Sequence, residues 1–450
     1  MKNTNIAFLP IVRRTFDVPL AEEMIRAARV NLTAAGFHLF GPEHSITDFP
    51  TAKQIATELS RESIDLLLIF QATFADSTMV VELVETLDAP VFLWAVPEPW
   101  SGGRLRLNSL CGINVAAHAL TLRKKKYDYA YGMPQDVKIT EQIRTLALGG
   151  LLRRRLKTAR LGVVGEHPAG MDTCNLDEAK LRELFGIQIQ RVELEDVFDR
   201  ARSANKTTID QTRAIIDTRL DNLASLEQVP LNGTLSVYNA LKEIAIEQKL
   251  DGLAVRCWPE FFTQLGCAAC GAMSMLSDGL GLEAALPCSC EADINGTLTQ
   301  LMLQILADAP AFGTDIVGVD LAQNMLALWH CGLAPLSMAD PNLPAHGGVH
   351  SNRGLPLVMD FQLKPGPITF ARISQATGNI SLVLGKGEML SFPKPFSGTS
   401  GTLRPGGTTE KFLEVLMRDG LEHHISLVYG DYLAELQAFA HQAGISVLTI

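Results

Sequence analysis

Two carboxylates and two imidazoles lie in stretches of the chain that are otherwise apolar or rich in glycine. They are Glu291 ahead of an apolar helical run, Asp315 where a strand should begin, His330 at the end of an apolar strand, and His424 near the C-terminus. Carboxylate combined with imidazole suits Mn²⁺, Mg²⁺ or Co²⁺ better than a soft metal. The spacing alone leaves other roles open, namely helix capping for Glu291 and Asp293, turn chemistry for Asp315 and a hydrogen-bonded core position for His330.

The elements that must position these side chains follow a strand–helix–strand rhythm over the first two thirds of the chain. Leu66–Phe70 and Pro90–Trp94 form continuous apolar runs, as strands covered on both faces do, and helical spacing over 80–87 separates them. A second unit begins at Arg160–Gly165 and reaches the apolar run Gly252–Arg256. This alternation predicts parallel sheets with helices on both faces.

From about residue 311, short apolar segments alternate with connections rich in glycine and proline, which predicts a mostly β region. We therefore expect an α/β protein with two doubly wound, Rossmann-like parallel-sheet domains followed by a mixed, mostly β domain. The expected domains are 1–157, 158–310 with Glu291, and 311–450 with a closing helix near 432–443. No GxGxxG or Walker pattern opens either α/β domain, which argues against a nucleotide cofactor.

The composition limits the classes of partner. The 450 residues include 39 Lys and Arg against 49 Asp and Glu, a net charge of −10 that disfavours nucleic acid as the main ligand. No run of roughly 18 apolar residues occurs, so we expect no membrane span. Eight unevenly placed cysteines do not form a disulfide scaffold. These features favour a soluble, cytoplasmic protein.

Several motifs in order along almost the whole chain resemble the L-fucose isomerase and L-arabinose isomerase superfamily, most closely its L-fucose isomerase-like branch. Glu291 in Glu-Ala-Asp-Ile-Asn-Gly is similar to the first metal-binding glutamate of that family, and Asp315 after Phe312 is similar to its second carboxylate. The family has one residue between the aromatic and the acid, whereas two intervene here, which leaves Asp320 as a weaker substitute. His424 resembles the family's C-terminal histidine ligand.

The resemblance also implies roles in binding the sugar. His330 matches a histidine that ligates metal on the arabinose side of the superfamily only, so it ranks second as a ligand. Arg13 resembles an N-terminal arginine that helps to bind sugar, and Trp94 resembles a tryptophan that packs on sugar from a neighbouring subunit. Trp258 and Glu260 follow a strand of the second sheet, where α/β proteins place their sites. Packing for the indole and a surface turn for the acid remain open.

The family's reaction is metal-dependent aldose–ketose isomerisation through an enediolate, with a proton moved between C1 and C2. The resemblance thus implies that Glu291 and Asp315 serve as metal ligands and as the acid/base pair. It further implies Mn²⁺ or a similar ion, a sugar substrate and a homo-oligomer, typically a hexamer. Two alternatives keep the fold: an isomerase of a charged 6-sulfo or 6-phospho aldose, and a non-catalytic sugar-binding protein.

Other polar and sulfur-bearing residues have competing interpretations. His346 and His350 lie in a glycine-rich loop that could approach the site or stay exposed. Four cysteines could form a thiolate zinc site, although the apolar residues around them favour buried free thiols; they are Cys267, Cys270, Cys288 and Cys290.

Overall fold

The protein is described by a computed structural model that covers residues 4–450 and divides into two compact units. Unit 1 holds the described residues up to Arg155 together with Ala434–Gly444, and unit 2 holds Leu156–Leu433 and Ile445–Ile450. Among residues 4–450, every helix is too short or too polar to cross a bilayer.

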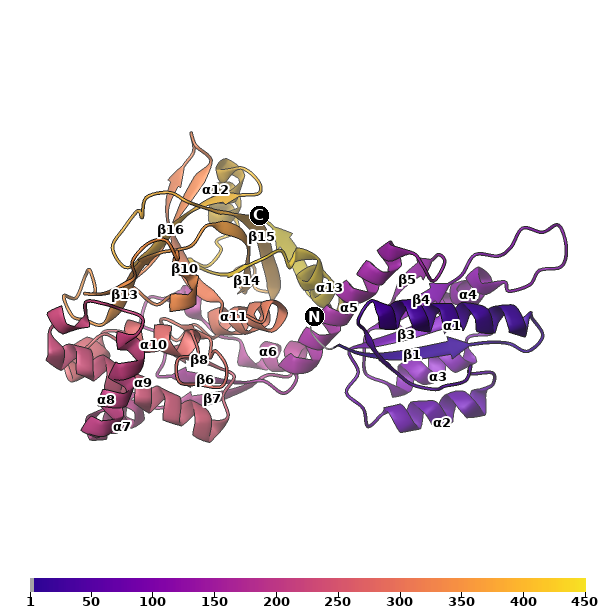
Figure 1. Cartoon of the computed structure of the whole chain (residues 1–450), viewed down its shortest axis with the longest axis horizontal. Helices are drawn as coiled ribbons and strands as arrows, with labels where there is room; N and C mark the ends of the chain where they lie inside the picture. The colour runs from indigo at the N-terminus through magenta and orange to yellow at the C-terminus, as the bar shows by residue number, and fades with distance from the viewer. Residues whose placement is uncertain (1–3) are drawn as a thin grey trace. The chain divides into compact units, whose positions relative to one another are not determined.

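Unit 1 is built on a five-stranded parallel sheet with the order β2-β1-β3-β4-β5 (Figure 1). Its strands are β1 Asn5–Ile11, β2 His38–Phe40, β3 Leu66–Gln71, β4 Val91–Ala95 and β5 Asp128–Tyr131. Its helices are α1 Val18–Ala34, α2 Phe49–Leu59, α3 Thr78–Thr86, α4 Ser109–Leu122 and α5 Val137–Leu156, and most of α13 Leu433–Ala443 belongs here.

Helices cover both faces of this sheet because its strands are apolar on both sides. Alternate residues of β1 enter two different cores: Ile6 and Phe8 pack with α1 and α5, while Ala7 and Leu9 pack with α2, α3 and α4. Figure 1 shows α1 and α2 on opposite sides of the strands. Unit 1 is therefore doubly wound, as the alternating pattern predicted.

Unit 2 begins with a four-stranded parallel sheet of order β7-β6-β8-β9. Its strands are β6 Arg160–Val164, β7 Gln188–Val192, β8 Gly252–Val255 and β9 Cys288–Ser289. The accompanying helices are α6 Glu178–Phe185, α7 Leu194–Ser203, α8 Lys206–Asp217, α9 Gln228–Gln248, α10 Cys270–Ser277 and α11 Ile294–Ala307. Short helical turns lie at Asp172–Cys174, Leu223–Ser225, Phe261–Leu265 and Leu336–Met338.

The rest of unit 2 is a nine-stranded, mainly antiparallel sheet of order β12-β13-β16-β11-β10-β17-β14-β15-β18. An additional pairing of β16 with β15 closes part of it into a barrel-like form. The strands are β10 Phe312–Asp320, β11 Met325–His330, β12 His346–Gly348, β13 Val358–Gln362, β14 Gly366–Ser374, β15 Ser381–Leu390, β16 Thr399–Pro405, β17 His424–Tyr429 and β18 Ser446–Thr449. Helix α12 spans Thr409–Arg418.

Helix α11 joins the two sheets of unit 2. It contacts β8 and β9 of the parallel sheet and β10, β14 and β17 of the nine-stranded sheet. Its residues are almost all buried, and one apolar core contains Val164 and Leu253 of the first sheet with Leu326 and Phe370 of the second.

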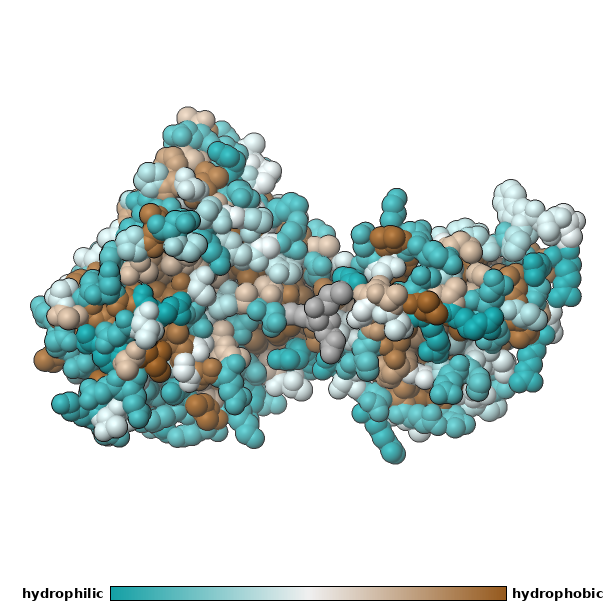
Figure 2. All heavy atoms as spheres, viewed as in Figure 1, coloured by the Kyte–Doolittle hydropathy of each residue, from teal (hydrophilic) through white to brown (hydrophobic). Residues whose placement is uncertain are grey.

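The face in Figure 2 carries mostly hydrophilic side chains with apolar residues in small groups, consistent with apolar residues gathered inside. The predicted α/β fold class is confirmed.

Candidate functional site

The predicted ligands converge because three adjacent strands of unit 2 bring their ends together. Strand β10 pairs with β17 so that Asp315 lies opposite His424, and β10 pairs with β11 so that Asp315 also lies opposite Trp329, next to His330. One potential ligand atom from each of Asp315, His330 and His424 lies within 4.8 Å of the others. A second group with the same spacing joins Glu291 and His424 with Cys174.

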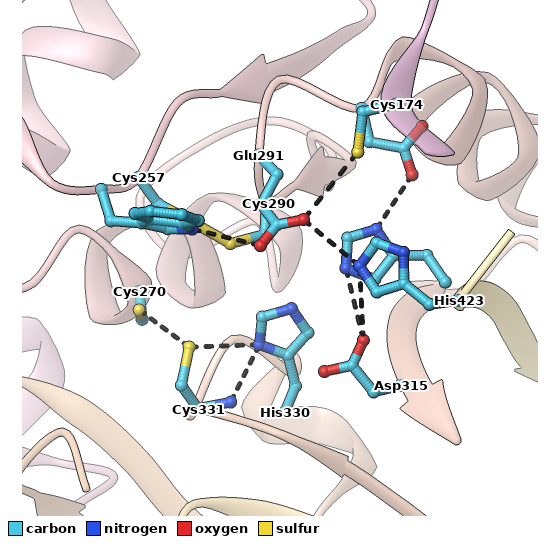
Figure 3. Close-up of a disulfide and its surroundings, with 12 residues drawn as sticks. Cys174, Cys257, Cys270, Cys290, Glu291, Asp315, His330, Cys331 and His423 are labelled. Carbon is cyan, nitrogen blue, oxygen red and sulfur yellow. Dashed lines mark hydrogen bonds and ion pairs between the residues drawn. A yellow bond between two sulfur atoms is a disulfide. The ribbon is translucent and has the colours of Figure 1, made fainter. Parts of the chain in front are cut away.

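Glu291 reaches this centre from the turn between β9 and α11. Glu291 and Ala292 both adopt positive φ values, 60° and 55°, which non-glycine residues rarely do. Such strain persists where surrounding contacts hold it, often at functional sites. Here the Trp258 indole N–H donates to Glu291 Oε1 across 3.1 Å, and the Cys174 thiol donates to Oε2 across 3.8 Å (Figure 3).

The position of the Glu291 segment is also fixed by a covalent bond. Cys257, which precedes Trp258, forms a disulfide with Cys290, which precedes Glu291. The Cα atoms of the two cysteines are 5.9 Å apart. The indole donor and the carboxylate acceptor therefore follow two covalently linked residues.

His423 is a functional candidate that the sequence interpretation did not assign. Its Nε2 lies 3.2 Å from Glu291 Oε2 and 3.9 Å from Asp315 Oδ1, and its Nδ1 is 2.9 Å from Thr173 Oγ1. Figure 3 shows His423 between the two carboxylates. The doubled histidine before an apolar strand was the available signal, but nothing in the sequence indicated that both rings face the site.

The orientation of His424 is set by Asp293, the residue at the N-terminus of α11. His424 Nδ1 lies 3.0 Å from Asp293 Oδ2, so Nδ1–H donates and Nε2 faces Asp315 Oδ1 at 3.5 Å. Arg372 donates to both oxygens of Asp293, with Nη2 at 3.0 Å from Oδ1. Asp293 Oδ1 also accepts from the Gly296 amide at 2.9 Å, the capping role that the sequence left open for this residue.

The charges around this chain of contacts shift three pKa values. Burial alone would raise the pKa of Asp293, but the Arg372 guanidinium and His424 outweigh it and hold the pKa well below its usual range. Burial alone would lower the pKa of His424, yet the hydrogen bond and charge of Asp293, with Asp315 and Glu291, raise it. Burial would raise the pKa of Glu291, whereas His423, His424 and Trp258 lower it overall.

His330 differs from His424 in both protonation and tautomer. Burial lowers the pKa of His330 to about 4, because the opposing charge of Asp315 only partly offsets desolvation. Its Nδ1 accepts a hydrogen bond from the Cys331 backbone N–H across 2.8 Å, so the single proton of the neutral ring sits on Nε2. In this tautomer Nδ1 is engaged and Nε2 carries the proton, which ranks His330 behind His424 as a ligand for a cation.

The residues predicted to bind sugar fall in different places. Trp258 contacts Glu291, whereas both oxygens of Glu260 pair with Arg256, at 2.9 and 2.7 Å. Arg13 is half-exposed in unit 1, 3.8 Å from Asp76. Trp94 is buried in the core of unit 1, where its indole N–H donates to the Gly132 carbonyl, so its placement gives no support to a sugar contact.

The chain matches known proteins over both units. Residues 7–148 match the family described as fucose/sulfoquinovose isomerase, N-terminal domain, and residues 351–450 match L-fucose isomerase, C-terminal domain. A protein of Priestia aryabhattai named sulfoquinovose isomerase is 31% identical over 439 residues, 97% of each chain. Another of that name from Alkalicoccus urumqiensis is 31% identical over 454 residues, 99% of each chain.

The chain belongs to the fucose/sulfoquinovose isomerase family. It is therefore an aldose–ketose isomerase, as the resemblance of its motifs implied, and the alternative of a non-catalytic sugar-binding protein is set aside. A solute-binding protein of Actinobacillus succinogenes with bound D-allose is 11% identical over 62% of this chain and 83% of its own, but its TM-score of 0.17 supports no conclusion. The family is metal-dependent, and the residues described here include groups able to hold a cation.

Proposed function

We propose that this isomerase converts an aldose with a sulfonate at C6, sulfoquinovose, into the corresponding ketose with the help of a divalent cation. The full-length similarity to proteins named sulfoquinovose isomerase supports a charged sugar. The observation that carries the metal assignment is that Glu291 and Asp315 each lie close to His424, in two ligand groups of unit 2 that share this histidine. Of the substrates considered from sequence, the similarity to these relatives favours the 6-sulfo aldose over a neutral sugar.

The residues of this centre fit a cation. Asp315 Oδ1 is buried and lacks a hydrogen-bond partner among residues 4–450, although it faces His424 Nε2 at 3.5 Å. An unpaired buried carboxylate oxygen is costly unless a positive group compensates it. We assign Glu291, Asp315 and His424 as the ligands, with His330 second. This donor set suits Mn²⁺ best, then Mg²⁺ or Co²⁺.

The chain's own residues supply the rest of the chemistry. When bound, the cation would polarise the sugar carbonyl and offset the negative charge that develops as the C–H proton leaves. Glu291 or Asp315 takes that proton from one carbon and returns it to its neighbour. Trp258 and His423 hold the Glu291 carboxylate in place through its two oxygens.

Four expectations remain proposals at this point: sugar binding by named residues, assembly, location and the division into domains. Sugar binding by Arg13, whose cation would suit an anionic substituent, rests on the resemblance alone, as does sugar binding by Trp258 and Glu260. Assembly into a homo-oligomer, a hexamer by resemblance, and a cytoplasmic location are likewise proposed. The division into domains 1–157, 158–310 and 311–450 is also a prediction.

The test is a ketose-formation assay on metal-stripped protein with added Mn²⁺. Sulfoquinovose and D-glucose form a matched pair of substrates because they differ only in the C6 substituent. We expect turnover of sulfoquinovose that depends on Mn²⁺, with kcat/KM at least about 100-fold above that for glucose or L-fucose. Equal turnover of the neutral sugars would contradict the substrate assignment, and turnover unaffected by chelator would contradict the metal assignment.

A further inference from the structure

A second group of metal-ligating atoms lies beside His330, apart from the carboxylates. Cys270 Sγ, Cys331 Sγ and a ring nitrogen of His350 all lie within 4.8 Å of one another, and we call these three residues the thiol cluster. Figure 3 shows Cys270 and Cys331 on the far side of the His330 ring from Asp315. The mechanism proposed above uses none of the three.

The thiol cluster is assembled from three separate segments of unit 2. Cys270 is the first residue of α10, Cys331 directly follows β11, and His350 belongs to the turn after β12. The two cysteines are 1% and 7% exposed. The His350 ring packs edge-on against Phe262, with centroids 5.1 Å apart. The three donors are therefore held by packing rather than by one flexible loop.

The donor set differs chemically from the carboxylate centre. Two thiolates and an imidazole are soft to borderline ligands that select Zn²⁺ or a similar thiophilic ion over Mn²⁺ and Mg²⁺. The sulfur atoms of Cys270 and Cys331 are 3.1 Å apart and not bonded to each other. Two thiolates on a tetrahedral ion at about 2.3 Å lie roughly 3.7 Å apart, so a small side-chain rotation would admit the ion.

We propose that Cys270, Cys331 and His350 form a second cation site that binds Zn²⁺ through two sulfurs and one nitrogen, with a fourth position open. On binding, each thiol releases its proton to solvent and the sulfur donates a lone pair to the ion. The four cysteines considered from sequence do not converge in this way, because Cys290 is bonded to Cys257 instead. Cys267, Cys270 and Cys288 are buried free thiols, as the apolar residues around them favoured.

A bound ion would connect the His350 turn to the secondary-structure elements that carry the two cysteines. Residues 351–354 of this turn are exposed, whereas α10 is buried throughout. A bound ion would anchor the turn to α10 and to the end of β11. Since Cys331 follows His330, the ion would also restrain the chain beside the proposed active centre.

Cobalt distinguishes the two centres, because Co²⁺ bound to thiolate shows an intense near-ultraviolet charge-transfer band that carboxylate and imidazole ligands do not give. We would titrate the reduced full-length protein with Co²⁺ alone, in the wild type and in Glu291→Gln. We expect the band in both, since Glu291 is not part of the thiol cluster. Zn²⁺ added afterwards should displace Co²⁺ and abolish the band.

Matched variants test whether the charge-transfer band comes from the thiol cluster. Cys270→Ser should remove the band, and His350→Ala, in a partly exposed turn, should weaken Zn²⁺ binding by at least about tenfold. Cys267→Ser is the control, because Cys267 is equally buried three residues earlier and lies outside the cluster. No band in the reduced wild type, or a band that survives Cys270→Ser, would overturn the proposal.

Limited proteolysis supplies a second readout that does not depend on the cysteine variants folding. Arg353 lies in the exposed part of the His350 turn and is a trypsin cleavage site. Zn²⁺ alone should slow cleavage after Arg353 by at least about fivefold, and His350→Ala should cancel this protection. Equal cleavage with and without Zn²⁺, or oxidation of Cys270 and Cys331 to a disulfide in the purified protein, would argue against a zinc site.

Discussion

His424 Nδ1 donates a hydrogen bond to Asp293 Oδ2 across 3.0 Å, while its Nε2 points at Asp315 Oδ1. This one contact fixes both the tautomer and the direction of the ring. Metal-ligating histidines commonly donate their second N–H to a carboxylate, which orients the ring and increases its basicity. Asp293 is thus a positioning residue whose effect should appear in metal binding.

Asp293→Asn should weaken Mn²⁺ binding and shift its pH dependence. Asp293 raises the pKa of His424, so a proton competes with the cation for Nε2, and affinity should fall by about tenfold per pH unit below that pKa. With asparagine the raised pKa returns toward its ordinary value, and the fall should move to lower pH. At pH 8 the loss of the orienting carboxylate should cost roughly 10- to 100-fold in affinity.

The measurement is the free Mn²⁺ concentration by electron paramagnetic resonance during titrations at several pH values. Asp308→Asn is the control, since Asp308 is an exposed residue at the opposite end of the same helix. Identical pH profiles for Asp293→Asn and the wild type would remove Asp293 from the metal centre.

Removing either carboxylate of the centre should abolish isomerisation. Glu291→Gln and Asp315→Asn each remove a negative oxygen from the site while keeping the size of the side chain, so we expect a fall in kcat of at least about 10³-fold with unchanged circular dichroism. Asp320→Asn is a matched control on the same strand. Asp320 only caps the turn at Gln323, and its replacement should leave kcat within about twofold. If kcat fell strongly in Asp320→Asn but not in Asp315→Asn, Asp320 rather than Asp315 would be the second carboxylate of the centre.

The two buried histidines should rank differently as metal ligands. His424→Ala removes the nitrogen that faces Asp315, and Mn²⁺ affinity should fall by more than about 100-fold. His330→Ala should cost less than about tenfold, because the His330 ring carries its proton on Nε2 and accepts a hydrogen bond at Nδ1. Isothermal titration with Mn²⁺ checks the ranking, and the reverse order would indicate an arabinose-type ligand set.

The type of each secondary-structure element could be predicted where the local pattern of apolar and polar residues fits only one element. Apolar runs such as Leu66–Phe70 predicted buried parallel strands, and the doubly wound sheet of unit 1 follows from them. The motif around Glu291 predicted the start of a buried helix, and Asp293 caps that helix as expected. Local sequence patterns were thus sufficient to predict helices and strands along the chain.

The residues that contact the site residues could not be predicted from the sequence, because they come from distant segments of the chain. Arg372 lies 79 positions from Asp293, and no local pattern indicates that its guanidinium is buried on that carboxylate. His423 precedes a strand, so its direction is set by the chain entering β17 rather than by strand alternation. Trp94 resembled a tryptophan that packs on sugar from a neighbouring subunit, and no local pattern indicated that its ring packs against Phe70 and donates to the Gly132 carbonyl.

Breaking the buried ion pair between Arg372 and Asp293 should destabilise unit 2. Arg372→Met leaves the Asp293 carboxylate buried with only His424 and the Gly296 amide as partners, at a cost of about 3–5 kcal/mol. Arg372→Met combined with Asp293→Asn removes the uncompensated charge and should recover about half of that loss. Urea denaturation of the single and double variants measures the coupling.

The same pair predicts an acid-dependent stability. The folded pKa of Asp293 lies below its unfolded value, so its contribution is complete above the ordinary carboxyl pKa of 3.8 and is lost as the pH falls through the depressed folded value. In Arg372→Met the main charge that lowers this pKa is gone, so Asp293 should take up its proton at higher pH. The difference in unfolding free energy between wild type and variant should therefore shrink as the pH falls from 6 toward roughly 3. A difference that stays constant over this range would show that the variant acts through packing of the Arg372 side chain rather than through its charge.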